Sequence, residues 1–375
     1  MMKTAGRTHT ARIPDFRLES GYVFDEVTLA YETFGTLNAE RSNAVLIQHA
    51  LTADSHVTSG VEEPARAEHP GGFAPGWWEE LVGPGRGIDT EDWFVVCTNA
   101  LGGCNGSTGP TSAHPDGLPY GSRFPHVTIR DMVHAEIALS DLLGIDRWHA
   151  VIGGSMGGAR SLEWAVTAPE RVEKLTVLAA PAYSDADHIA WAHTQINAIE
   201  LDPDYCGGDY RALGRFPETG LGIARQIAHL TYRADAELNH RFGNDLQDPT
   251  PPHREGESYY AIQSYLDHQA RKLVNRFDAE SYRVLTGALR DHDVRRGRSA
   301  DLAETLSTVT AEVQLLSISS DRLYTPGHVA QIGAALPGSP KPTIIPSWAG
   351  HDGFLTETAQ LTDHIGDFLN ATSRR

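Results

Sequence analysis

Short, continuous apolar runs recur through the first half of the chain and again near its end, a pattern typical of strands buried on both faces of a sheet. These runs cover residues 43–49, 93–99, 148–152, 174–180 and 313–319. Residues 130–143 instead carry apolar side chains at helical spacing and are followed by Gly144, which predicts an amphipathic helix with a glycine cap. Strands that alternate with helices predict an α/β fold, with a mostly parallel central sheet and helices on both faces.

Weaker patterns predict the remaining parts of this sheet. Loose alternation over residues 22–34 predicts a hairpin-like pair of strands. Residues 60–90 are rich in glycine and proline and predict an irregular loop, in which Trp77 and Trp78 are expected to anchor the loop on the core. After the last apolar run, the chain is expected to form a helix at 328–336, a strand at 343–345 and a terminal helix at 357–369.

The alternation of strands and helices stops at residue 184 and returns after residue 298. In between, apolar residues recur at helical intervals among many charged residues, which predicts a mostly helical segment. We therefore expect an α/β core formed by residues 1–183 and 299–375. Residues 184–298 are expected to be inserted into this core as a helical lid.

Composition and charge exclude several classes of protein. The chain has 375 residues, of which 40% are hydrophobic and 21% charged, so it is long enough to bury a large core. Its formal net charge of −18 at pH 7 argues against nucleic acid or an anionic membrane as partner, because either would need a basic face. No run approaches the roughly 18 apolar residues that a membrane-spanning helix needs.

Cysteine usage and the start of the chain indicate a cytoplasmic protein. Cys97, Cys104 and Cys206 form no C-x-x-C pair and leave an odd count, so neither a disulfide framework nor a zinc site is expected. Residues 1–12 lack the apolar segment of a secretory signal. We expect reduced thiols, no metal and no permanently bound cofactor.

A glycine-rich segment, G-G-S-M-G-G at residues 153–158, follows one of the apolar runs and opens into a helical pattern. Ser155 is therefore expected on a tight turn between a buried strand and a helix, as in the G-x-S-x-G nucleophile elbow of α/β-hydrolases. Side chains at Gly153 and Gly157 would collide with the neighbouring strand and helix. The alternative is a glycine-rich turn with an incidental serine, since both residues are common in turns.

An acid and a histidine follow this serine in the chain order that α/β-hydrolases use. Asp321 follows the last apolar run and His351 precedes the terminal helix, so both fall where functional residues of open α/β sheets gather. A single Asp or His in a loop is usually solvated surface. Together the three residues predict a triad in which His351 takes the proton of Ser155 and Asp321 orients the histidine. Such a triad predicts acyl transfer through an acyl-serine.

The loop after the apolar run at residues 43–49 is expected to complete the reaction centre. In the α/β-hydrolase fold this loop supplies one backbone N–H of the oxyanion hole, and the residue after the nucleophile supplies the other. We therefore assign the hole to the N–H groups of Leu51 and Met156. For His49, at the end of the run, we prefer a structural role in which the ring bonds to nearby backbone.

Five motifs together resemble the homoserine O-acetyltransferases of methionine biosynthesis. They are H-A-L-T at 49–52, L-G-G-C at 101–104, G-G-S-M-G-G at 153–158, S-D-R-L at 320–323 and G-H-D-G-F at 350–354. The resemblance extends from about residue 18 to the terminal helix. It implies acetyl-CoA as donor, L-homoserine as acceptor and a ping-pong reaction through acetyl-Ser155. It also implies a cytoplasmic homodimer whose helical lids meet.

The resemblance further implies residues that bind the acceptor. Residues 222–233 match the substrate-binding stretch of that family, in which Arg225 would hold the homoserine carboxylate with Tyr232 nearby. Asp352, beside His351, would take the ammonium group. From the residues alone, Arg225 would be a surface arginine on a charged helix and Asp352 a cap of the terminal helix.

Three alternatives stay open from the sequence. The same scaffold would serve a succinyl-CoA donor or a serine acceptor, although a succinyl group would need an extra cation, and the loops at residues 51–53 and 101–103 offer none. A carboxylesterase would share the triad without needing an amino-acid clamp. The third alternative is a catalytically silent α/β-hydrolase that serves as a binding protein.

Overall fold

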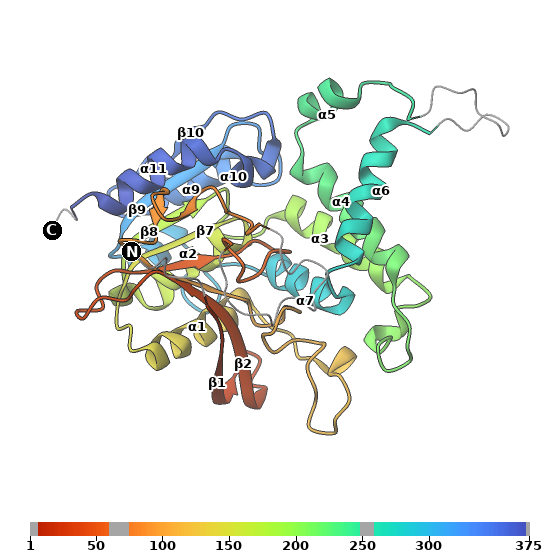
Figure 1. The fold of residues 1–375 in the computed structure, drawn as a ribbon, viewed down its shortest axis with the longest axis horizontal. Helices are drawn as coiled ribbons and strands as arrows, with labels where there is room; N and C mark the ends of the chain where they lie inside the picture. The colour runs from red at the N-terminus through yellow and green to blue at the C-terminus, as the bar shows by residue number, and fades with distance from the viewer. Residues whose placement is uncertain (1–6, 60–74, 248–258, 373–375) are drawn as a thin grey trace.

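An eight-stranded sheet organises the chain in the computed structural model, which describes residues 7–59, 75–247 and 259–372 (Figure 1). From one edge to the other the strands are β1 (Arg7–Arg17), β2 (Val23–Phe34), β6 (Phe94–Thr98), β3 (Ala44–Gln48), β7 (Trp148–Gly154), β8 (Val172–Leu178), β9 (Glu312–Ile318) and β10 (Thr343–Ile345). All neighbours from β6 to β10 pair in parallel, which confirms the predicted mostly parallel sheet.

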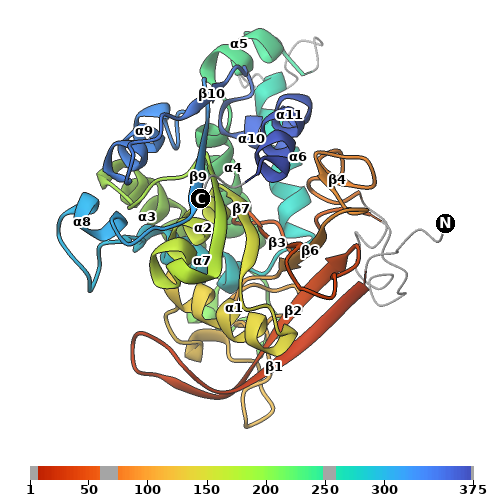
Figure 2. The same ribbon diagram turned by 90° about the vertical axis from the view of Figure 1, so that its left-hand side faces the viewer.

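The first two strands differ from the sequence prediction. Residues 22–34 do not form a pair of strands; they contribute the single long strand β2, which pairs antiparallel with β1. The turn lies earlier, at Gly21 with φ 87°. No element was predicted over β1, because only some of its side chains, such as Ile13 and Phe16, are buried and the pattern is that of a half-exposed edge strand. β1 lies beside the first helix, α1 (Figure 2).

Helices cover both faces of the sheet, as predicted. One face is covered by α1 (Ile129–Leu143), α2 (Met156–Thr167) and α9 (Pro326–Ala335), and the other by α11 (Thr358–Asn370). β3 shows how the sheet is buried, because Leu46 packs into the first of these layers while Val45 and Ile47 pack into the second. α1 ends at Gly144 with φ 65°, which confirms the predicted glycine cap. Within the described residues, no helix is both long and apolar enough to cross a membrane.

The predicted irregular loop at residues 60–90 contains a small element of its own. Residues 60–74 lie outside the described residues. After them, β4 (Val82–Gly83) and β5 (Ile88–Asp89) form a short parallel pair. Trp78 is buried, and the indole N–H groups of Trp77 and Trp78 donate to the backbone carbonyls of Asp54 and Phe354, respectively. The two tryptophans anchor this loop on the core, as predicted.

Before α8 (Leu302–Leu306), five α-helices of the described chain follow β8 and project to one side of the sheet (Figure 1). They are α3 (Ala186–Glu200), α4 (Glu218–Tyr232), α5 (Asp235–Phe242), α6 (Ala261–Val274) and α7 (Ala279–Arg290). α3 packs against α4 and α7, and α4 packs against α6. The helical character of the segment agrees with the sequence prediction, while its division from the core at residues 184 and 298 stays a prediction. Residues 248–258 of the segment lie outside the described residues.

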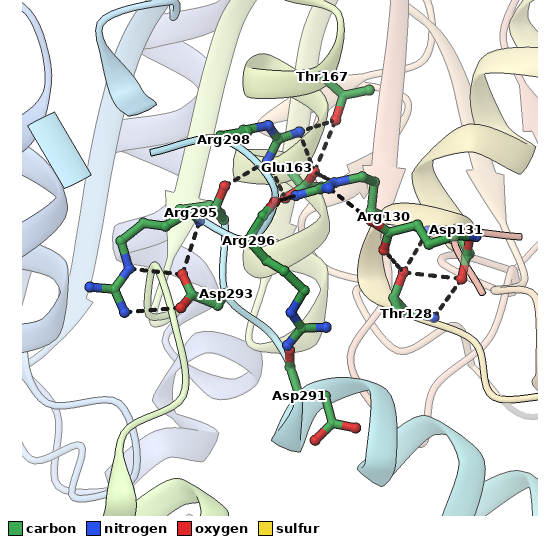
Figure 3. A network of polar contacts seen from close by, with 12 residues as sticks. Thr128, Arg130, Asp131, Glu163, Thr167, Asp291, Asp293, Arg295, Arg296 and Arg298 are labelled. Carbon is green, nitrogen blue, oxygen red and sulfur yellow. Dashed lines mark hydrogen bonds and ion pairs between the residues drawn. The ribbon is translucent and has the colours of Figure 1, made fainter. Parts of the chain in front are cut away.

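The chain returns from these helices to the core through residues 291–298, which are held by a network of ion pairs (Figure 3). Glu163 of α2 is buried and accepts hydrogen bonds from Arg130 of α1 (2.7 Å) and from Arg298 (2.6 Å). Arg298 also donates to Thr167 (2.8 Å). Burial alone would raise the pKa of Glu163, but the charges of Arg298 and Arg130 hold it below its ordinary value. The network therefore fixes the returning chain to α2, the helix that follows Ser155.

Candidate active site

Ser155 occupies the turn between β7 and α2 in a strained backbone conformation, with φ 60° and ψ −126°. Such a conformation costs a residue other than glycine about 1–3 kcal/mol. The flanking glycines are required by close packing: a Cβ at Gly153 would lie 2.2 Å from the carbonyl oxygen of Gly157. One at Gly157 would lie 2.0 Å from the carbonyl oxygen of Gln48. The structure thus contains the predicted strand, tight turn and helix, for the predicted reason.

Two side chains from loops at the carboxyl ends of other strands meet Ser155 at this turn. His351 Nε2 lies 2.8 Å from Ser155 Oγ, and His351 Nδ1 lies 2.6 Å from Asp321 Oδ2. The other oxygen of Asp321 accepts the backbone N–H groups of Leu323 (2.8 Å) and Tyr324 (2.9 Å), which fixes the carboxylate. His351 therefore donates from Nδ1 and presents Nε2 to the serine hydroxyl. All three side chains are buried, and the arrangement can remove the proton of a serine.

A cavity opens at Ser155 between the sheet and the inserted helices. Its empty volume is about 480 Å³ including its mouth, and both Leu51 and Ser155 line it. The Leu51 N–H has no hydrogen-bond acceptor among the described residues. The Met156 N–H is the first of α2 and so has no acceptor within the helix. Two available N–H donors beside a serine nucleophile are what an oxyanion hole requires.

Half of the residues that line the cavity come from two inserted helices, α3 and α7. Their lining side chains are His188, Trp191, Ala192, Gln195, Thr286, Leu289 and Arg290. Arg290 lies at the end of α7, where its Nε donates to Asp291 (2.9 Å). The wall is therefore largely neutral and partly aromatic, with a guanidinium group on one side.

Arg225 and Tyr232 come to the same region from α4. Tyr232 lines the cavity, and its ring centre lies 5.8 Å from that of His351. The guanidinium carbon of Arg225 lies 5.5 Å from the Tyr232 ring centre. Arg225 donates a long hydrogen bond to Thr52 (3.4 Å), while its buried Nε has no partner in the described chain. A guanidinium group with unused donors is well suited to bind a carboxylate.

Asp352 lies next to His351 and already has one partner. Its Oδ2 lies 3.2 Å from Arg233, which also pairs with Glu237. Burial raises the pKa of Asp352, while the charges of His351 and Arg233 oppose this rise. One carboxylate oxygen thus remains for a ligand.

Two arginines at this site were not among the predicted residues. Arg233 follows Tyr232 directly within the predicted binding stretch, but no spacing in the sequence pairs it with Asp352. Arg276 donates to the Thr52 carbonyl (2.7 Å) across a separation of 224 residues. Because only the folded chain brings such distant positions together, no local pattern could have identified Arg276.

Asp185, His188 and His328 form a cluster beside the cavity, with potential ligand atoms within 4.8 Å of one another. The Thr325 N–H donates to His328 Nδ1 (3.0 Å), which leaves the ring proton on Nε2, facing Asp185 (3.1 Å). His188 Nε2 donates to the Leu323 carbonyl (2.8 Å). If His328 Nε2 bound a metal, the ring proton would have to move to Nδ1, where it would face the Thr325 N–H, which is also a donor. The cluster therefore joins α3 to the core and is a poor metal site.

A buried ion pair lies behind the nucleophile turn. Arg160 of α2 and Glu136 of α1 are hydrogen-bonded to each other with side chains 0% and 2% exposed. Glu136 also accepts from Gln48 and Trp164, both at 2.7 Å. Gln48 is the last residue of β3, so the pair connects both helices to the strand that leads into the Leu51 loop.

Known proteins share both the sequence and the fold of this chain. A family model described as alpha/beta hydrolase fold matches residues 43–358. A homoserine O-acetyltransferase from Thermobifida fusca (strain YX) is 52% identical over 353 residues, covering 94% of this chain and 90% of the relative. The crystal structure of a homoserine O-acetyltransferase from Bacillus anthracis superposes with a TM-score of 0.89 at 28% identity, covering 99% of each chain. Esterase E22 superposes with a TM-score of 0.85 at 27% identity, covering 97% of this chain and 100% of the esterase. The chain therefore belongs to the α/β-hydrolase fold family and, within it, to the homoserine O-acetyltransferase family.

Proposed function

We propose that this protein transfers the acetyl group of acetyl-CoA to the hydroxyl group of L-homoserine, with Ser155 as the nucleophile. The observation that carries the proposal is the hydrogen-bonded chain from Ser155 through His351 to Asp321, which opens on a cavity. Membership of the homoserine O-acetyltransferase family selects the donor and the acceptor. The products are CoA and O-acetyl-L-homoserine, an intermediate of methionine biosynthesis.

The first half-reaction acetylates the serine. His351 takes the proton of Ser155 Oγ as this oxygen attacks the thioester carbonyl carbon. The N–H groups of Leu51 and Met156 stabilise the negative oxygen of the tetrahedral intermediate. When the carbon–sulfur bond breaks, His351 gives its proton to the departing sulfur. Acetyl-Ser155 and free CoA result.

The second half-reaction moves the acetyl group to the acceptor. His351 takes the proton of the homoserine hydroxyl, whose oxygen attacks the acetyl carbon. The ester bond to Ser155 then breaks, and the proton returns to Oγ. Water would hydrolyse the same ester, so the walls supplied by α3 and α7 favour transfer by holding a positioned hydroxyl group in place of bulk solvent.

Three residues of the site are assigned to the acceptor. Arg225 binds the homoserine carboxylate, and its Nε without a partner supports this role. Asp352 binds the ammonium group with the oxygen that Arg233 leaves available. Tyr232 lies between Arg225 and His351 and forms the wall along which the substrate would extend. An acceptor held at both charged ends presents its hydroxyl group to His351.

The proposal includes a cytoplasmic homodimer in which the helical lids, residues 184–298, meet. α4 exposes Ile223 (43%) and Leu230 (40%), seven residues apart on one helix face. Exposed large apolar side chains at helical spacing support an interface on the lid. The three cysteines are free thiols, which suits a reducing compartment. Sedimentation equilibrium should show a dimer for the wild type and a monomer for the double variant Ile223→Asp, Leu230→Asp.

Product identity tests the choice of donor and acceptor. Release of the CoA thiol is followed from acetyl-CoA and from succinyl-CoA, each with L-homoserine or L-serine, and the product mass is measured. We expect O-acetylhomoserine as the dominant product. O-succinylhomoserine or an acylserine would reject the proposed substrates and leave the acyl-serine chemistry in place.

Ester hydrolysis is the second candidate, because esterase E22 shares this fold over nearly the whole chain. Turnover of p-nitrophenyl acetate with and without homoserine separates the two reactions. A transferase is accelerated by homoserine, whereas an esterase is indifferent to it. Acceleration with formation of O-acetylhomoserine is the expected result.

A further inference from the structure

His49 lies directly before the loop assigned to the oxyanion hole and has no part in the mechanism above. Its side chain is 1% exposed, and both ring nitrogens contact backbone. The Ala100 N–H donates to Nε2 (2.9 Å), so the ring proton is on Nδ1, which donates to the Ala50 carbonyl (2.7 Å). These bonds confirm the structural role predicted for His49, bonded to nearby backbone.

The carbonyl that His49 binds belongs to the same peptide group as the Leu51 N–H. A peptide group is planar, so fixing the Ala50 carbonyl also fixes the direction of the Leu51 N–H. The Ala53 N–H donates to the same oxygen (3.0 Å), so two donors hold this group. Hydrogen bonds at the carbonyl end also polarise the amide and strengthen its N–H as a donor.

The surroundings of His49 keep its ring neutral. Burial and then the positive charge of Arg160 lower its pKa to about 3. A neutral ring offers one donor and one acceptor, which match the Ala50 carbonyl and the Ala100 N–H. A second ring proton would face the Ala100 N–H. His49 therefore keeps one tautomer over the pH range in which His351 acts as a base.

We propose that His49 is a positioning residue for oxyanion stabilisation, whose Nδ1–H holds the peptide group between Ala50 and Leu51 so that the Leu51 N–H is aimed at the oxyanion formed at Ser155. The inference rests on the proposed function through the nucleophile and is independent of the acceptor. Loss of an oxyanion donor typically costs about 10²–10³-fold in rate. A misdirected donor should therefore lower the rate of acylation more than the affinity for the ground state.

Two variants separate the two ends of the ring. His49→Asn keeps a donor near the Nδ1 position but is too short to reach Ala100, whereas His49→Gln extends toward Ala100 without a donor at Nδ1. We expect His49→Asn to form the acetyl-enzyme about ten times faster than His49→Gln. The rate is measured as the burst of p-nitrophenol from p-nitrophenyl acetate, with the difference in the limiting rate of the burst and not in the substrate concentration that gives half of that rate. Equal rates, or a faster His49→Gln, would overturn the proposal.

Two further measurements distinguish positioning from a role in folding alone. Affinity for methylboronic acid, which forms a tetrahedral adduct with Ser155, should fall in His49→Gln by about the same factor as acylation. Affinity for a non-reactive thioether analogue of acetyl-CoA should change much less. Equal loss for both ligands, in step with a lower Tm, would reject positioning. A wild type that shows the burst but transfers nothing to homoserine would reject the proposed acceptor alone.

Discussion

The active site has a sheet side, which carries Ser155, Asp321 and His351, and a helical side, which carries Arg225. The polar side chains on the two sides differ in how many of their hydrogen-bonding atoms have partners. On the sheet side, both oxygens of Asp321 and both ring nitrogens of His351 have partners, and the chain of bonds ends at Ser155. On the helical side, Arg225 of α4 keeps a buried Nε without a partner in the described chain, and Arg233, directly after α4, binds one oxygen of Asp352. The hydrogen bonds of the sheet side are complete within the protein, whereas the helical side keeps donors that the proposed acceptor would use.

On the proposed assignments, reaction type and acceptor choice reside in separate parts of the chain. The candidate reacting groups follow the carboxyl ends of strands of the sheet. The candidate acceptor-binding groups Arg225 and Tyr232 stand on the inserted helix α4. A solved structure named as an esterase shares the fold, so the scaffold alone does not choose the acceptor. Changes on the two sides should therefore affect the two half-reactions differently.

Removing the nucleophile breaks the sheet side and has the largest expected effect. Ser155→Ala should lower acetyl-enzyme formation and overall transfer together, by about 10⁴-fold or more, because both half-reactions pass through Ser155. Mass spectrometry after mixing with acetyl-CoA measures the acetyl-enzyme, and thiol release measures transfer. Ser20→Ala, at an exposed turn, is the control. Transfer at the wild-type rate in Ser155→Ala would discard the assignment.

Removing the guanidinium group on the helical side should separate the half-reactions. Arg225→Met should lower kcat/KM for homoserine by about 100-fold, because a charge-assisted hydrogen bond to the substrate is lost. Acetyl-enzyme formation from acetyl-CoA should fall much less. Arg271→Met, an exposed arginine of α6, is the matched control. An equal loss in both half-reactions would contradict a role confined to the acceptor.

Neutralising Asp352 should have a smaller effect on the same half-reaction. Asp352→Asn should lower kcat/KM for homoserine by about tenfold, since Arg233 already occupies one oxygen of the carboxylate.

The raised pKa of Asp352 also predicts a pH dependence of kcat/KM for homoserine. Only the ionised form attracts the ammonium group, so kcat/KM should rise with pH through the pKa of Asp352. The variant should lack that rise, and an unchanged profile in Asp352→Asn would reject the ammonium role. Asp363→Asn, on the exposed face of α11, is the control.

Removing the Glu163 ion pairs, which connect the core to the chain that returns from the inserted helices, should lower the stability of the fold more than the rate of the reaction. Glu163→Gln removes the buried partner of Arg130 and Arg298 and should lower the free energy of unfolding by about 3 kcal/mol at pH 7. The folded-state pKa of Glu163 is lowered, so its contribution is present above about pH 4.3 and is lost as pH falls through the folded value.

Urea unfolding at several pH values measures this difference. The gap between the wild type and Glu163→Gln should be widest near neutrality and narrow in acid. Glu170→Gln, at an exposed position, should show no such gap. A gap that widens as the pH falls would contradict a stabilising ionised Glu163.

The sequence predicts elements whose pattern is repeated and misses contacts that only the folded chain creates. β3, β7 and the turn at Ser155 were predicted because apolar runs and glycines mark them locally. β1 was missed because a half-exposed edge strand has a weak pattern. The buried pair of Arg160 and Glu136, and the contact of Arg276 with Thr52, join positions far apart in the chain. Charged side chains are usually solvated, so the residue type alone would place Arg160, Glu136 and Arg276 on the surface.

The backbone of Ser155 has a consequence for how this protein can change over generations. A glycine would adopt φ 60° and ψ −126° without the strain that serine bears. Ser155→Gly should therefore leave the folded protein as stable as the wild type or more stable by about 1 kcal/mol, while ending acyl transfer. Selection for stability alone would remove this serine. If the serine is kept while the rest of the sequence changes, its retention indicates that the reaction is still required.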